Sequence, residues 1–220
     1  MHIAVDGVTL EGDLAIPDGG ARGLVVFAHG SGSSRLSPRN REVARALNDA
    51  GLGTLLMDLL TADEEAIDRR TGGLRFDVPL LAERVAVAVD TLVEPDTPTA
   101  GLAIGLFGAS TGAAAALVAA AIRAGTVRAV VSRGGRPDLA AAALSKVQAP
   151  TLLIVGGEDR QVLTLNRQAH DAMRCERRLV VIPGATHLFE EPGALAAVAA
   201  LAAEWFVTHL HRPAPSRPAT

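Results

Sequence analysis

Short apolar runs bounded by glycine or proline alternate with longer, alanine-rich segments along almost the whole chain. Six runs are expected to be buried strands, at residues 24–28, 53–57, 104–108, 129–132, 151–155 and 178–182. Five segments of helical period lie between or after them, at about residues 39–50, 78–92, 112–124, 163–173 and 193–210. Because strands that are covered on both faces have continuous apolar sequences, this alternation predicts an α/β fold. We expect a mostly parallel central sheet with helices on both faces.

The two ends of the chain and one long connection depart from this alternation. Residues 8–16 alternate apolar and polar side chains after the turn-like Asp6-Gly7, which predicts an antiparallel hairpin at the N-terminal edge of the sheet. We expect one domain over residues 1–211, followed by a Pro-rich, disordered tail at residues 212–220. The charged connection at residues 59–77 is expected to be a loop that rims the ligand site, and it is too short for a separate lid domain.

The motif with the clearest chemical meaning is G-x-S-x-G at residues 108–112, GASTG, between an expected strand and an expected helix. This strand, sharp turn and helix exposes a serine hydroxyl at the end of a sheet, and the glycines let the strand and the helix approach each other. We therefore predict that Ser110 is a nucleophile. Thr111 then begins a helix, and its free N–H is predicted to stabilise an oxyanion.

A serine hydroxyl needs a base to activate it, and the base needs a carboxylate to orient it. His187 follows the last expected strand and is the predicted general base, and Asp159 follows the strand before it and is the predicted acid. The order Ser, Asp, His is typical of serine nucleophiles on such a turn. Asp138, which follows the strand at residues 129–132, and Glu158 stay open as alternative acids.

The segment HGSGSSR at residues 29–35 follows the first buried run. A loop in this place supplies the second oxyanion donor of such sites, and we assign it to the N–H of Ser31, which has glycines on both sides. We expect His29 and Asp58 to anchor loops rather than to take part in the chemistry.

Three arginines near expected strand ends are possible substrate-binding residues, because a guanidinium binds carboxylates and phosphates well. They are Arg133, Arg136 and Arg35. The alternative for Arg133 and Arg136 is a solvated loop with internal ion pairs. Arg75 and Glu190 also lie near the expected mouth of the site, with no specific role implied.

The segments HGSGSSR, GASTG, GGEDRQV and GATHLF, in this order, resemble the dienelactone-hydrolase-like branch of the α/β-hydrolase superfamily over about residues 8–207. The resemblance implies the α/β-hydrolase fold. Dienelactone hydrolases resemble one another in having cysteine at the elbow, whereas this chain has Ser110, which favours a carboxylic ester hydrolase that forms an acyl-enzyme on a small-molecule ester. Alternatives are a dienelactone, lactone or C–C bond hydrolase, a peptidase or an acyltransferase with the same triad, and a non-catalytic binding module.

Composition and charge argue against several other classes. The net charge is −3 and the basic residues are scattered, so we expect no nucleic-acid partner. Cys175 is the only cysteine, and no signal peptide or membrane span is expected, which favours a cytoplasmic protein. A monomer and a homodimer both stay open. We expect no metal or organic cofactor, since HGSGSS lacks the ending of a phosphate loop. Surface or packing roles are expected for Cys175, His170, His209 and His211.

Overall fold

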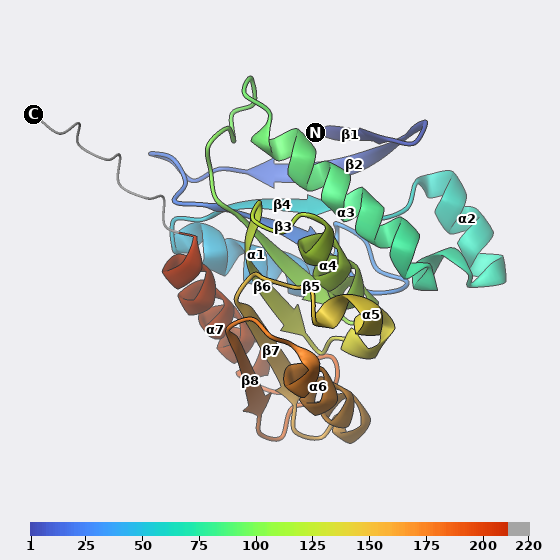
Figure 1. Ribbon diagram of the computed structural model, residues 1–220, viewed down its shortest axis with the longest axis vertical. Coiled ribbons are helices and arrows are strands. Elements are labelled where there is room, and N and C mark those ends of the chain that lie inside the picture. The colour runs from blue at the N-terminus through green and yellow to red at the C-terminus, as the bar shows by residue number, and fades with distance from the viewer. Residues whose placement is uncertain (211–220) are drawn as a thin grey trace, which may run out of the picture.

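The computed structural model describes residues 1–210 and arranges them around an eight-stranded sheet (Figure 1). The strands are β1 (His2–Val5), β2 (Val8–Ala15), β3 (Leu24–Ala28), β4 (Gly53–Met57), β5 (Ile104–Ala109), β6 (Val127–Arg133), β7 (Thr151–Gly156) and β8 (Arg177–Ile182). Their order across the sheet is β1-β2-β4-β3-β5-β6-β7-β8. The β1–β2 and β2–β4 pairs are antiparallel, and all the others are parallel. The expected mostly parallel sheet with an N-terminal edge hairpin is confirmed.

Helices cover both faces of the sheet. They are α1 (Pro38–Asp49), α2 (Ala62–Thr71), α3 (Val78–Val93), α4 (Thr111–Ile122), α5 (Ala141–Leu144), α6 (Arg160–Ala172) and α7 (Ala194–His209), with short 3-10 turns η1 (Leu74–Phe76) and η2 (Pro137–Ala140). The helices α3, α4 and α6 lie on one face of the sheet, and α1 and α7 lie on the other (Figure 1). Their apolar side chains belong to two separate core clusters, one on each face. The five expected helices are confirmed, with ends shifted by up to three residues.

The strands in the middle of the sheet are the ones that carry the most apolar sequences. Every residue of β3, β4, β5 and β7 is buried, because each of these strands has a neighbour on both sides and helices above and below. The expectation that residues 178–182 form a buried strand is wrong in one respect. β8 is the last strand of the sheet, and none of its six residues is buried.

The connection at residues 59–77 is helical, so the expectation of a loop is wrong. Thr61 accepts a hydrogen bond from the N–H of Glu64 and Glu64 accepts one from the N–H of Thr61, a reciprocal cap that starts α2. Gly72 ends the helix with a φ of 67°. The Arg84 guanidinium of α3 donates to both carboxylate oxygens of Glu64, at 2.6 and 2.8 Å, which attaches α2 to the rest of the fold.

The topology decides where a ligand site can form. From β3 the chain crosses to β4 on one side and later returns to β5 on the other side of β3. The loops that leave the carboxyl ends of β3 and β5 therefore run in opposite directions and open a crevice between them. The HGSGSSR segment follows β3 and Ser110 follows β5, so both lie at this switch point.

Candidate active site

Ser110 lies at the sharp turn between β5 and α4. Its φ of 51° and ψ of −121° are strained for a residue with a side chain. The two flanking glycines are required by close packing: a Cβ at Gly108 would lie 2.3 Å from the Cα of Ala113, and one at Gly112 would lie 2.2 Å from the carbonyl oxygen of Ala28. The turn therefore holds the serine hydroxyl at the end of the sheet.

His187 contacts both of the residues that the sequence pairs with it. Its Nδ1 lies 2.6 Å from Oδ2 of Asp159, and its Nε2 lies 3.3 Å from Oγ of Ser110. An ionised carboxylate only accepts hydrogen bonds, so Nδ1 carries the hydrogen and the lone pair of Nε2 faces the serine hydroxyl. The Asp159 side chain is 15% exposed and that of His187 is 38% exposed, so the base is reachable from solvent.

Backbone hydrogen bonds hold the three loops that carry these residues against one another. The N–H of Glu158 donates to the carbonyl of Ala185 at 3.0 Å, which joins the loop of Asp159 to that of His187. The N–H of Ser110 donates to the carbonyl of Arg133 at 3.1 Å. The geometry is thus set by the backbone at the carboxyl ends of β5, β6, β7 and β8, which are neighbours in the sheet.

The other carboxylates have different partners. Asp138 receives two hydrogen bonds from Arg136, at 2.9 and 2.7 Å, and this bonding lowers the pKa of the Asp138 carboxyl. The side chain of Glu158 is 56% exposed, with Arg160 at 4.0 Å. Of the three carboxylates that the sequence left open, Asp159 is the one that contacts His187.

The predicted oxyanion donors come from two sides of Ser110. A Cβ at Gly30 would lie 3.1 Å from the Cβ of Ser110, so the backbone that leads into Ser31 passes close to the nucleophile. Thr111 is the first residue of α4, where N–H groups have no partner inside the helix. The roles of Ser31 and Thr111 as oxyanion donors stay predictions.

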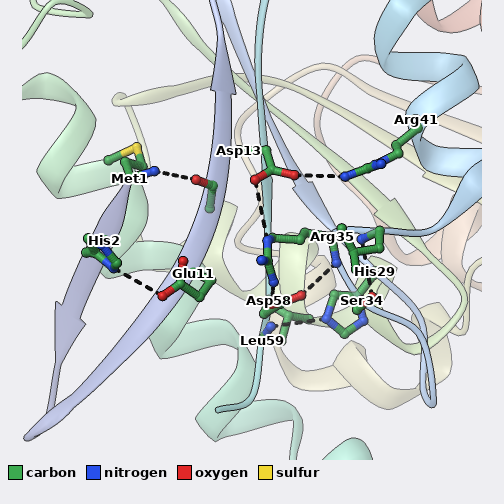
Figure 2. A network of polar contacts seen from close by, with 12 residues as sticks. Met1, His2, Glu11, Asp13, His29, Ser34, Arg35, Arg41, Asp58 and Leu59 are labelled. Atoms are coloured by element: carbon green, nitrogen blue, oxygen red, sulfur yellow. Dashed lines mark hydrogen bonds and ion pairs between the residues drawn. The ribbon is translucent and has the colours of Figure 1, made fainter. Parts of the chain in front are cut away.

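The residues at both ends of the loop at residues 30–34 are hydrogen-bonded to the segment that directly follows β4, as Figure 2 shows. At one end, His29 Nε2 accepts a hydrogen bond from the N–H of Leu59 at 3.1 Å. At the other end, the Asp58 carboxylate accepts a hydrogen bond from the N–H of Arg35 at 2.7 Å and another from the Arg35 guanidinium. Because Asp58 and Leu59 are consecutive residues after β4, the loop spans a fixed distance. The expected anchoring roles of His29 and Asp58 agree with these contacts.

The His29 anchor makes stability depend on pH. Burial lowers the pKa of His29 from its ordinary value of 6.5, so the folded protein keeps the ring neutral. As the pH falls below about 6.5, the unfolded chain takes up the proton first, and the free energy of unfolding is expected to fall by up to about 1.4 kcal/mol per pH unit. Urea unfolding at pH 7, 6 and 5 measures this slope. His29→Gln should have a smaller slope, and an identical slope in the two proteins would refute the assignment.

The three nominated arginines differ in their partners. Arg35 binds Asp58 and lies 3.4 Å from Asp13 (Figure 2), and Arg136 is paired with Asp138. Arg133 is 8% exposed, and its Nε and Nη1 have no hydrogen-bond partner among residues 1–210. Their roles in binding substrate stay predictions. Arg39 of α1 was not among the residues predicted from the sequence. It pairs with Glu190 at 3.1 Å, and a contact between residues 151 positions apart cannot be recognised from a local sequence pattern.

A cavity of about 370 Å³ lies beside the loop at residues 29–34. One wall is the loop at residues 29–34, and the other includes Leu59, Leu60 and the side chains of Asp68, Arg69 and Arg75 from the α2–η1 segment. The segment at residues 59–77 thus lines this cavity, and it does so as a helix; its place at the rim of a ligand site stays a prediction. Arg75 is bound to Asp68 at 2.6 Å and forms part of this wall.

The remaining side chains that could bind a metal ion or act as nucleophiles are spread over the fold. Burial raises the pKa of the Cys175 thiol, which lies just before β8. His209 packs against Trp205 with ring centres 4.4 Å apart and the ring planes tilted by 55°. Within residues 1–210, no three His, Cys, Asp or Glu side chains are grouped so as to hold a metal ion. In the same range, no helix has both the length and the apolar sequence needed to cross a membrane. His211 and the tail lie outside the described residues.

Comparisons with known proteins identify the family and the fold of the chain. The sequence pattern of the dienelactone hydrolase family matches residues 10–210. The crystal structure of a dienelactone hydrolase from Anabaena variabilis has a TM-score of 0.92 and 60% identity, covering 96% of this chain and 97% of that one. Est1E from Butyrivibrio proteoclasticus has a TM-score of 0.79 at 18% identity, covering 94% and 97%, which shows the fold alone. A Mycobacterium tuberculosis protein with the provisional name of a phosphoribosyl transferase is 55% identical over 98% of this chain, which spans 47% of that relative's length.

Proposed function

This chain belongs to the dienelactone hydrolase family and is a hydrolase of the α/β fold, and from this premise we propose that it is a serine carboxylic ester hydrolase. Its substrate is a small-molecule ester, and its reaction passes through an acyl-enzyme on Ser110. The observation that carries the proposal is the position of His187, within hydrogen-bond distance of Ser110 Oγ and of Asp159 Oδ2 at once. No cofactor is needed for this chemistry.

In the first half of the reaction, Ser110 Oγ attacks the ester carbonyl carbon as His187 Nε2 takes the hydroxyl proton. Asp159 keeps the hydrogen of His187 on Nδ1 and stabilises the imidazolium that forms. The carbonyl oxygen gains negative charge, and the N–H groups of Ser31 and Thr111 stabilise it. The imidazolium then gives its proton to the leaving alcohol as the C–O bond breaks.

In the second half, water attacks the acyl group on Ser110. His187 removes a proton from this water, and the second tetrahedral intermediate uses the same two N–H donors. Collapse of that intermediate releases the acid and returns the proton to Ser110. The exposure of His187 supports this step, since the water must reach Nε2 from solvent.

The size of the cavity beside the loop at residues 29–34 supports the proposal of a small substrate. Its volume of about 370 Å³ is at the lower end of the range for small-molecule sites, and its walls combine leucines with serines and charged side chains. The name of the mycobacterial relative is not carried over to this chain, which matches less than half of that protein. Lactone cleavage uses the same steps with a cyclic ester and is the alternative within the family.

A fluorophosphonate probe and a panel of p-nitrophenyl esters test the proposal together. The probe is expected to label one residue, Ser110, and mass spectrometry of the peptide identifies the site. Short-chain esters such as the acetate and butyrate should be hydrolysed, and prior labelling should abolish the turnover. A folded protein that is neither labelled nor active would favour a non-catalytic binding module. A labelled protein that cleaves dihydrocoumarin but no open-chain ester would favour a lactonase.

A further inference from the structure

The loop that joins β6 to η2, called the β6–η2 loop, lies between the proposed nucleophile and the proposed base. The carbonyl of Arg133 accepts the N–H of Ser110, and the N–H of Arg136 donates to the carbonyl of Ser110, both at 3.1 Å. Gly134 has a φ of 52°, and a Cβ there would lie 3.3 Å from the carbonyl oxygen of His187 and 3.5 Å from its Nδ1. A shift of this loop would therefore move the nucleophile relative to the base.

The side chain of Asn166 binds the same loop from α6. Its Nδ2 donates to the carbonyl of Gly135 at 2.9 Å and to the carbonyl of Val162 at 2.8 Å, so both hydrogens of the amide are used. Asn166 is fully buried, and its Oδ1 has no hydrogen-bond partner among residues 1–210. A buried acceptor without a partner costs stability. Stability alone therefore gives no reason for an amide at this position, whereas its donor has a defined target in the loop.

The helix that carries Asn166 also carries the proposed acid. Asp159 is the N-cap of α6, and its carbonyl accepts the N–H of Leu163 at 2.8 Å. Asn166 lies about two turns further along the same helix, which packs against η2. The bond from Asn166 to Gly135 therefore joins the helix of the acid to the loop that lies between the nucleophile and the base. The bonds of this loop to Ser110 are made by backbone groups, whereas the bond from Asn166 is made by a side chain that a substitution can change.

We propose that Asn166 is a positioning residue, which holds the β6–η2 loop in place and thereby sets the distance between Oγ of Ser110 and Nε2 of His187. These two atoms lie 3.3 Å apart, near the upper limit for a hydrogen bond, so a small shift of the loop is enough to separate them. Asn166 is buried behind the loop and takes no part in bond making or breaking. The inference rests on the proposed ester hydrolysis and adds a supporting residue to it.

Two substitutions remove the donor in different ways. Asn166→Asp keeps the shape of the side chain, but at pH 9 its ionised carboxyl can only accept hydrogen bonds and faces the carbonyl of Gly135. Asn166→Leu removes the donor without adding charge. Because small misplacements of reacting groups are costly, each variant is expected to lower kcat for p-nitrophenyl butyrate by about 10- to 100-fold. KM should stay within about threefold of the wild type, since Asn166 does not line the cavity at residues 29–34.

The pH dependence of the loss separates positioning from a structural role. Burial raises the pKa of a carboxyl, and a protonated carboxyl can donate through its hydroxyl. The kcat of Asn166→Asp relative to the wild type is therefore expected to rise by about fivefold or more between pH 9 and pH 6. The relative kcat of Asn166→Leu should not change with pH. The charged side chains of the adjacent η2 segment, Arg136 and Asp138, are bonded to each other, so their charges offset one another near the new carboxyl.

Asn48→Asp and Asn48→Leu are the matched controls. Nδ2 of Asn48 donates to the carbonyl of Leu52 at 2.9 Å and to the hydroxyl of Thr54 at 3.1 Å, so the same kind of side-chain donor is lost. These bonds join the end of α1 to the start of β4, at the opposite end of the sheet from Ser110. Each control is expected to lower the Tm by about 2–4 °C and to keep kcat within about twofold of the wild type.

Fluorophosphonate labelling distinguishes a misplaced site from an unfolded one. Complete labelling of Ser110 in both Asn166 variants, at a lower rate than in the wild type, would support positioning. Asn166 variants that keep the wild-type kcat would refute the inference while the hydrolase stands. A kcat that falls only with the labelled fraction, independently of pH, would also refute it, because it would assign Asn166 to the fold. A wild type that neither reacts with the probe nor cleaves the ester would overturn the hydrolase proposal and this inference with it.

Discussion

Ser110→Ala is expected to lower kcat for ester hydrolysis by about four to six orders of magnitude while the fold stays intact. Without the hydroxyl there is no attacking oxygen and no acyl-enzyme, so His187 has no nucleophile to activate. The remaining rate comes from oriented water and from the oxyanion donors alone. Steady-state kinetics with p-nitrophenyl butyrate measures the loss, and circular dichroism checks the fold.

Ser132→Ala is the matched control for this variant. Ser132 lies on the neighbouring strand β6 and is fully buried. Its Oγ has no hydrogen-bond partner in the described part of the chain, so its hydroxyl is expected to matter little for activity. A Ser110→Ala protein that still cleaves the ester at nearly the wild-type rate would contradict the nucleophile assignment. Equal losses in both variants would point to damage of the β5–β6 sheet instead.

The features that the sequence predicted well are those fixed by local pattern. β3 and β4 were expected with the observed ends, because each is a short, mainly apolar run that begins at or just after a glycine and is followed by a polar residue, His29 or Asp58. The elbow at Ser110 was found because strand, turn and helix lie within one short segment. Order along the chain then located Asp159 and His187, which the fold brings together at adjacent strand ends.

The features that the sequence missed depend on tertiary partners or on caps. α2 has no apolar stripe, so the periodicity of apolar residues did not predict this helix. Its ends are set by the caps at Thr61, Glu64 and Gly72. The sequence favoured Asp159 as the acid but left Asp138 open, because both residues follow strands. In the structure Asp159 contacts His187, whereas Asp138 is bound by Arg136. The lack of a partner at Arg133 is likewise visible only when the surrounding residues are placed.

Asp159→Asn is expected to lower kcat by about 10⁴-fold, the second large effect. The carboxylate accepts the Nδ1 hydrogen of His187 at 2.6 Å and so leaves the lone pair of Nε2 toward Ser110. An amide can instead donate to Nδ1, which moves the ring hydrogen to Nε2 and removes the acceptor that the serine proton needs. Initial rates with p-nitrophenyl butyrate, together with the rate of fluorophosphonate labelling, measure the effect.

Asp138→Asn makes the same chemical change at the alternative acid. This carboxylate is held by Arg136 at a partly exposed position, so the substitution is expected to cost less than about 1 kcal/mol of stability and to change kcat less than tenfold. The contrast between the two variants identifies the acid, because both lose one negative charge after adjacent strands. A large loss in Asp138→Asn with a small one in Asp159→Asn would transfer the role of orienting His187 to Asp138. It would also require the loop at residues 134–138 to move toward His187 during turnover.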